Sequence, residues 1–207
     1  MKKYLLALSI VFGLFTVTTV QAQSAKEVLD KCAAKVSARD GVKADFSMTS
    51  AQYGDASGKI AVKGKMFHAT TPMATMWFDG KTLWTYRKST NEVNITTPTA
   101  AEKQSINPYH FINIYKKGYS YTMRETTLRG KGAYEVTLNA TSPANKLRKM
   151  VITIDKATYH PLAVTMQRPK SSTTIYITSC KTKQKFNAST FSFKRSDYPS
   201  AEIIDLR

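Results

Sequence analysis

Apolar and polar residues alternate along most of this chain. Within residues 42–48, for example, Val, Ala, Phe and Met take turns with Lys, Asp and Ser. A two-residue period is typical of strands that bury one face and expose the other. Asp79-Gly80, between two such segments, is a strong signal for a hairpin turn. The pattern predicts strands at residues 42–48, 59–66, 74–78, 82–86, 92–96, 119–123, 133–139, 150–154, 162–167, 174–178 and 190–193.

Helical spacing occurs in two places. Ser24 and Glu27 form a capping-box pattern, and apolar residues then follow at intervals of three and four. This predicts an amphipathic helix over 24–38. In the middle of the chain, Thr97 is suited to cap a helix and Pro98 to its first position. We expect one or two short helices between about 98 and 115.

These elements predict a mainly β (α+β) fold. Many short strands with so few helices exclude a parallel α/β architecture. An unclosed, strongly curved antiparallel β-barrel fits the pattern best. Because an open barrel exposes a concave apolar face, we expect the helices to form a lid over an apolar cavity.

The first residues have the features of a secretory signal peptide. Lys2 and Lys3 precede an apolar run from Tyr4 to Val20, and Val20-Gln21-Ala22 has the small residues of a cleavage site. The run is short for a membrane span. We therefore expect residues 1–22 to be removed near Ala22, and residues 23–207 to form one exported domain, large enough for a substantial core.

The chain is strongly basic. It has 31 Lys and Arg residues against 14 Asp and Glu residues, a net charge of +17. Such a surface attracts acidic partners, which for an exported protein are anionic lipid head groups, acidic protein surfaces or envelope polymers. A basic surface that only contacts water is the other interpretation. We expect no nucleic-acid partner.

Few residues of the chain suggest a metal site or a catalytic site. The histidines at 68, 110 and 160 are scattered, so we predict no metal site. The chain lacks a nucleophile elbow, a phosphate-binding glycine-rich loop and a paired acidic motif, so we predict neither an enzyme nor a cofactor. Cys32 and Cys180 can form a disulfide in an exported protein or remain free, and the sequence leaves both open.

A family resemblance rests on the predicted hairpin. Residues 78–86, Phe-Asp-Gly-Lys-Thr-Leu-Trp-Thr-Tyr, followed by Asn-Glu-Val at 91–93, resemble the central hairpin of LolA, the periplasmic outer-membrane lipoprotein carrier family. The likeness extends over nearly the whole exported part. Its further segments are Val62–Phe67, Asn107–Ile112, Phe191–Phe193 and Glu202–Asp205.

The resemblance implies a periplasmic carrier. In this family an apolar cavity holds the acyl chains of lipoproteins that an inner-membrane ABC transporter releases, and an outer-membrane acceptor, or the outer membrane itself, receives them. It implies no covalent step, and we expect a monomer. A carrier of another envelope lipid, or a lipoprotein-sensing regulator with the same fold, remains as an alternative.

We derive candidate site residues from the large apolar residues, which are far more numerous than residues suited to catalysis, and from the family resemblance. Several of them are methionines, whose flexible thioethers adapt to ligands of variable shape, although filling a core is their commoner use. Lys63 occupies the position of the family's lid-latching arginine, and an ammonium cannot copy the planar fork of a guanidinium. The predicted lipid-binding residues are Phe46, Met48, Ile60, Val62, Met66, Phe67, Met76, Trp77 and Trp84, with Phe111, Ile112 and Tyr115 in the lid and Lys63 as its latch.

Overall fold

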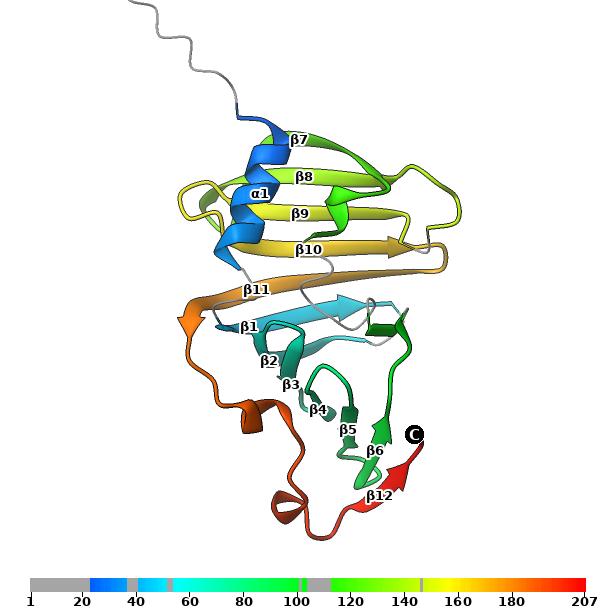
Figure 1. The fold of residues 1–207 in the computed structure, drawn as a ribbon. Coiled ribbons are helices and arrows are strands. Elements are labelled where there is room, and N and C mark those ends of the chain that lie inside the picture. Colours follow the sequence, from blue (N-terminus) through cyan, green and yellow to red (C-terminus); the bar gives the residue numbers. More distant parts are fainter. Residues whose placement is uncertain (1–22, 37–40, 52–53, 101, 104–112, 146) are drawn as a thin grey trace, which may run out of the picture.

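The sheet dominates the structure, a computed structural model that describes residues 23–36, 41–51, 54–100, 102–103, 113–145 and 147–207. Twelve strands form one sheet in this part of the chain, and one α-helix, α1 (Ala25–Lys35), packs against it (Figure 1). The short helices are η1 (Ile114–Lys116), η2 (Ala188–Phe191) and η3 (Arg195–Asp197). The strands are β1 (Gly41–Ser50), β2 (Ala56–Lys63), β3 (Met66–Thr70), β4 (Ala74–Phe78), β5 (Leu83–Arg87), β6 (Glu92–Thr96), β7 (Tyr119–Leu128), β8 (Lys131–Ala140), β9 (Lys149–Asp155), β10 (Pro161–Arg168), β11 (Ser171–Gln184) and β12 (Glu202–Asp205).

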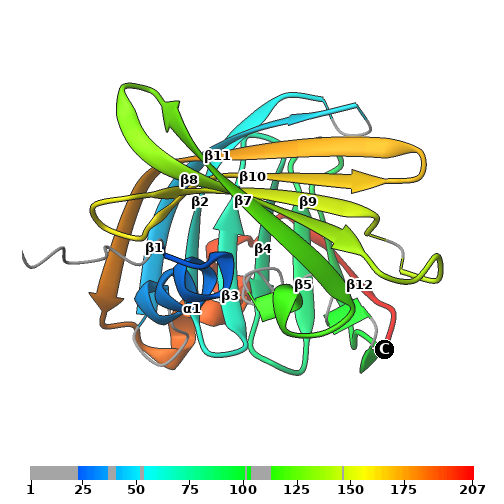
Figure 2. The ribbon, with the colours of Figure 1, turned by 90° about the horizontal axis from the view of Figure 1, so that it is seen from above.

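The order of strands across the sheet is β12-β6-β5-β4-β3-β2-β1-β11-β10-β9-β8-β7. β7 and β12 are its two edges, so the sheet is not closed. A mainly β, unclosed fold is therefore confirmed. The expectation of a purely antiparallel sheet is wrong at one edge, because β12 pairs with β6 in parallel. Figure 2 shows α1 on the inner side of the sheet.

The predicted N-terminal helix is confirmed with its cap. The Glu27 amide donates to Ser24 Oγ at 3.2 Å, and the Ser24 amide donates to Glu27 Oε2 at 3.0 Å. The helix ends at Lys35, earlier than predicted. In the second helical region the cap is Thr99 rather than Thr97. Thr99 and Glu102 exchange the same reciprocal hydrogen bonds, at 2.7 and 3.3 Å.

The strand predicted for 59–66 is in fact a hairpin. β2 ends at Lys63, Gly64 and Lys65 form the turn, and β3 begins at Met66. Gly64 adopts a φ of +62°, a left-handed conformation that glycine reaches without steric cost. The turn pairs Val62 with Phe67, so both side chains share the inner face of the sheet.

The C-terminal segment differs from the prediction. Residues 190–193 form no strand, because a 3-10 turn bends the chain there, with the Thr190 amide donating to the Asn187 carbonyl at 3.0 Å. The segment after β11 crosses the face of the sheet opposite α1, and Phe191 is fully buried there. Trp77 and Tyr86 of the sheet form an aromatic cluster with Phe193 and Tyr198 of this segment, with the centroids of contacting rings 4.6–5.7 Å apart.

The buried side chains on the inner face form two hydrophobic clusters. The larger joins α1 to β8, β9 and β10, through Val28, Leu29, Val136, Met150 and Ile154 among others. The smaller contains Val36, Val62, Phe67 and Phe78. Residues of α1 belong to the larger cluster, and Val36, which caps the C-terminus of α1, belongs to the smaller one. The helix therefore lies across the junction of the two clusters.

Candidate functional site: an apolar cavity between two cores

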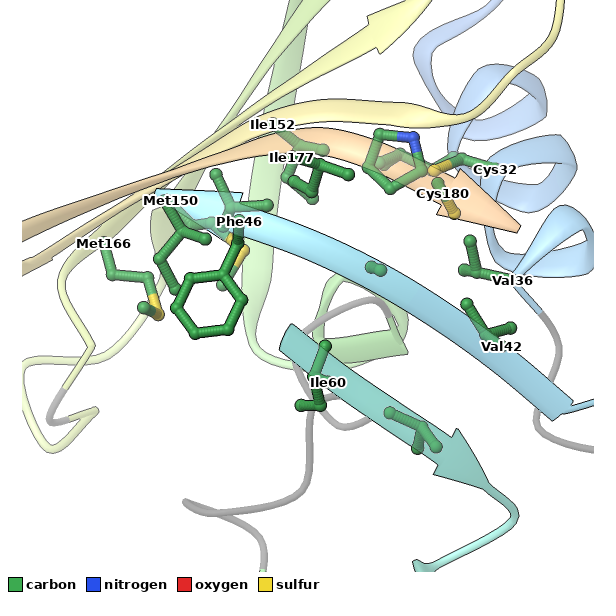
Figure 3. Close-up of a pocket in the computed structure, with 16 residues that line it drawn as sticks. Cys32, Val36, Val42, Phe46, Ile60, Met150, Ile152, Met166, Ile177 and Cys180 are labelled. Atoms are coloured by element: carbon green, nitrogen blue, oxygen red, sulfur yellow. The ribbon is translucent and has the colours of Figure 1, made fainter. Parts of the chain in front are cut away.

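An apolar cavity of about 260 Å³ lies at the junction of the two clusters. One wall is helical, and the others are the inner faces of five neighbouring strands (Figure 3). None of the lining side chains carries a charge at neutral pH. The lining residues are Leu29, Cys32 and Val36 from α1 and its end, Val42, Ala44 and Phe46 from β1, Ile60 and Val62 from β2, Met150 and Ile152 from β9, Pro161, Val164 and Met166 from β10, and Ile175, Ile177 and Cys180 from β11.

Strand alternation brings most of these residues to one face. Val42 pairs with Val62, and Ala44 pairs with Ile60, so β1 and β2 present an apolar row to the cavity. Phe46 pairs with Gly58, and a Cβ at Gly58 would lie 2.8 Å from the end of the Phe46 ring. The missing side chain at Gly58 therefore gives the Phe46 ring its place in the lining.

A β-bulge completes the lining on β11. The register runs from Phe46 opposite Ile177 to Asp45 opposite Ser179, which leaves Thr178 as an extra residue. The extra residue moves the inward position from Ser179 to Cys180, which pairs with Ala44. Unbroken alternation would have placed a hydroxyl in the cavity where the structure has a thiol.

The two thiols keep the cavity neutral. Cys32 and Cys180 are both free and lie at one end of the lining, while Phe46, Met150 and Met166 lie at the other (Figure 3). Burial, with a smaller contribution from Cys180, raises the pKa of Cys32 to about 12. Burial also raises the pKa of Cys180. Since the thiolate is the reactive form, neither cysteine is primed for nucleophilic chemistry.

The described residues show neither a metal-ligand cluster nor a membrane-spanning helix. Among them, no group of three or more His, Cys, Asp and Glu side chains is placed to hold a metal ion. No helix in the same part of the chain is long and apolar enough to cross a membrane. The arrangement suits an apolar ligand that is held without covalent bonds, because burial of apolar surface is the interaction it offers.

The predicted lipid-binding residues are distributed over both faces of the sheet. Phe46, Ile60 and Val62 line the cavity. Phe67 and Met76 belong to the smaller cluster beside it. Met48 shares the inner face through its pairing with Ile175 but is not among the lining residues, and Met66 pairs with Lys63 on the other face.

The two tryptophans lie on the opposite face from the cavity. Trp77 pairs with Trp84 across β4 and β5, on the face that the C-terminal segment covers. Its ring stacks on His68 at 5.4 Å and contacts Phe193 and Tyr198 edge to face. Trp77 is thus part of a packed cluster. Its size and apolar character suggested a ligand contact, but residue type does not reveal which face a folded chain leaves open.

The predicted latch, Lys63, also lies on that opposite face. It follows Val62, a cavity residue, and its ammonium donates to the Phe186 carbonyl at 3.3 Å. This contact ties Lys63 to the C-terminal segment. The Gly64 turn explains how Lys63 and Phe67 can be four residues apart and still lie on different faces.

Of the predicted lid, Phe111 and Ile112 lie outside the described residues. Tyr115, in η1, is buried in the larger cluster, and its hydroxyl donates to Asp30 Oδ1 at 2.5 Å. The Asp30 carboxylate also bonds Lys26, which is the main cause of its lowered pKa, and Tyr115 adds to the effect. Tyr115 therefore anchors α1, the helical wall of the cavity.

The predicted lipid-binding residues include none from β9, β10 and β11, which supply half of the lining, and none from α1. The alternation at 150–154, 162–167 and 174–178 predicted these strands and their apolar faces. The sequence did not show which strands are neighbours in the sheet, and that order decides which strands share the cavity. β2 and β9 are separated by three strands in the sheet, so only the bend of the sheet brings them to one cavity. The methionines in the lining are Met150 and Met166, not those of the N-terminal half.

One solved structure shares this fold, and two others are less similar. An uncharacterised conserved protein from Thermus thermophilus superposes with a TM-score of 0.59, at 14% identity, over 88% of this chain and 99% of that one. A putative outer membrane lipoprotein-sorting protein domain from Vibrio parahaemolyticus gives a TM-score of 0.43, at 13% identity, over 80% and 95%. Lipoprotein LppX from Mycobacterium tuberculosis gives 0.47, at 10% identity, over 80% and 100%.

Sequence comparison gives the family. A search of curated protein sequences found no significant match. The family model described as "Outer membrane lipoprotein carrier protein LolA" matches residues 15–170, which contain α1, β1 to β10 and most of the cavity lining. This match spans well over half of the chain and agrees with the resemblance of the 78–86 hairpin. The chain therefore belongs to the LolA family of outer membrane lipoprotein carrier proteins.

Proposed function

We propose that this protein is a periplasmic carrier that binds the acyl chains of lipoproteins released from the inner membrane and delivers them to the outer membrane. The observation that carries the proposal is the cavity, whose sixteen lining residues present an apolar and uncharged surface. Membership of the LolA family supports it. Its partners would be acylated lipoproteins, an inner-membrane ABC transporter that releases them, and an outer-membrane acceptor or the outer membrane itself.

The lining suits acyl chains for two physical reasons. Each buried methylene contributes about 0.8 kcal/mol, so even partial burial keeps an acyl chain from aggregating in water. Met150 and Met166 add adaptable thioethers at one end of the cavity. Because no charged group anchors the ligand there, binding stays reversible, as delivery to an acceptor requires.

Export is part of this proposal. Residues 1–22 would direct the chain out of the cytoplasm and be removed near Ala22, leaving residues 23–207 as the carrier domain. Mass spectrometry of the protein recovered from the periplasm tests this point. A mature chain that begins at Gln23 supports it, and a chain that retains its apolar start contradicts it.

Ligand identification tests the carrier function directly. The exported protein would be purified from cells without detergent, and co-purifying lipids identified by mass spectrometry. Triacylated peptides support lipoprotein carriage. A glycolipid or phospholipid would favour a carrier of another envelope lipid, and correct placement of outer-membrane lipoproteins after depletion of the protein would contradict lipoprotein carriage.

A chain-length series tests the cavity as the binding site. Affinity for fluorescent acyl probes should rise about tenfold for every two methylenes until the cavity is full, because two methylenes contribute about 1.6 kcal/mol. The head group of the probe should matter little. Affinity that follows the head group and ignores chain length would place binding elsewhere.

A further inference from the structure

Six lysines gather at one end of β1, β2 and β11. These strands are neighbours in the sheet, and Lys43 of β1 lies directly opposite Lys181 of β11. The start of β1 also pairs with Gln184, which brings the end of β11 alongside it. All six are exposed except the half-buried Lys63. We call them the basic patch: Lys43, Lys63, Lys65, Lys181, Lys183 and Lys185.

The charge of the basic patch is not compensated within the described chain. None of the four salt bridges in that part involves a residue of the patch. Lys63 bonds a carbonyl oxygen, which carries no net charge. Asp45 is the acidic residue on the same face of β1, and its strand partners are Lys59 and Ser179. Like charges directly opposite each other destabilise a strand pair. An anionic partner would remove this cost.

The composition of the patch indicates the class of partner. It contains lysines and no arginine, whereas protein interfaces are enriched in arginine and aromatic residues and depleted in lysine. Lysine is a compact, hydrated point charge without a fixed fork, which suits diffuse attraction to many head groups more than bidentate pairing with one carboxylate. The large hydrophobic residues exposed in the described chain, Met73, Ile203 and Leu206, are outside the strands that carry the patch.

We propose that the basic patch docks this protein on an anionic lipid bilayer. Juxtaposed lysines are attracted to such a surface by about 1 kcal/mol each, and the attraction falls off within a Debye length. Six neighbouring lysines therefore give a reversible contact that orients the molecule on the bilayer.

Docking through this patch would also fix the orientation of the cavity relative to the bilayer. Val42 and Ala44 line the cavity and alternate with Lys43 along β1, and Cys180 precedes Lys181 on β11. The cavity and the Lys43–Lys181 pair of the patch thus lie on the two faces of the same strands. A docked molecule would hold its cavity on the side of the sheet that faces away from the lipid. This consequence rests on the proposed carrier function, whereas the docking does not.

Vesicle binding tests the proposal. The mature protein would be sedimented with vesicles of pure phosphatidylcholine and with vesicles of equal parts phosphatidylcholine and phosphatidylglycerol. Replacing Lys43, Lys181 and Lys185 by Gln should lower partitioning onto the anionic vesicles about a hundredfold. The control replaces the exposed Lys117, Lys131 and Lys170 by Gln, which removes the same charge elsewhere and should leave most of the binding.

Two results would overturn the docking: equal losses in both triple variants, or equal binding of the unaltered protein to both kinds of vesicle. A separate measurement of acyl-probe affinity without vesicles keeps the carrier function distinct. That affinity should be the same in both triple variants and the unaltered protein. Loss of vesicle binding with intact acyl binding in the patch variant supports docking, whereas a protein that binds vesicles but no acyl probe contradicts only the carrier function.

Discussion

The cavity and the aromatic cluster lie on opposite faces of one sheet, and both are built from apolar side chains. In the cluster the rings contact one another: Trp77 is only 7% exposed and touches two rings edge to face, and polar side chains line the hollow beside it. The cavity is lined almost entirely by aliphatic and sulfur-containing side chains, with Phe46 as its one aromatic ring. Edge-to-face contacts bury a ring between its neighbours, whereas aliphatic side chains that face each other across a bend leave an apolar volume between them.

The largest expected effect is in the aromatic cluster. Trp77→Ala should lower the free energy of unfolding by about 3–5 kcal/mol, because it removes a buried ring that packs against His68, Phe193 and Tyr198. Ile177→Ala in the cavity should cost less than half as much, since that side chain already borders a hollow. Urea denaturation of both variants measures the difference. Equal costs would mean that the cavity is packed as tightly as the cluster.

A substitution that fills the cavity tests whether acyl probes bind there. Ala44→Phe should lower acyl-probe affinity at least about tenfold while changing the free energy of unfolding by less than about 1.5 kcal/mol, because the ring has space to occupy. The control, Ser47→Phe, lies on the other face of the same strand, opposite Tyr176, and should leave affinity unchanged. Fluorescence titration decides. If the two variants lose affinity equally, the probe does not bind in the cavity.

A smaller effect concerns the helical wall, which a polar contact holds in place. Tyr115→Phe removes the hydroxyl that donates to Asp30 and should cost about 1 kcal/mol at neutral pH. Asp30 has a lowered pKa, so its contribution is present above the ordinary Asp pKa and is lost as the pH falls through the lowered one. The deficit should therefore shrink in acid, where the neutral carboxyl is a weaker acceptor. A deficit of unchanged size at low pH would assign it to packing.

The smallest expected effect concerns the rates at which the two cysteines react with a labelling reagent. Cys32, with its pKa raised to about 12, should react with iodoacetamide at pH 8 far more slowly than the half-buried Cys180. A bound acyl probe should slow the reaction of Cys180 further, because both thiols border the same hollow. Peptide mass spectrometry reports each site separately. Similar rates at the two thiols would contradict the burial of Cys32 between α1 and the sheet.

Local patterns predicted the elements better than the site. The capping box at Ser24 and the turn at Asp79-Gly80 are contacts between residues close in sequence. In the structure Asp79 Oδ1 accepts the Thr82 amide at 2.7 Å. Which face of the sheet a side chain occupies, and whether that face is covered, depends on turns and distant segments that alternation alone does not reveal. Gly64 turned one predicted strand into two, and Trp77 was assigned to the cavity because its covering segment comes more than a hundred residues later.

The extra residue at Thr178 lets β11 keep its two faces although it has one residue more than its pairing with β1 uses. Beyond it, Cys180 faces the hollow and Lys181 faces outward, opposite Lys43. Loss of the Thr178 codon should remove the bulge and leave the same partners, Ile177 with Phe46 and Ser179 with Asp45. One further codon between Ile177 and Cys180 would instead exchange the sides of Cys180 and Lys181, which would bring an ammonium into the apolar cavity and a thiol to the solvent.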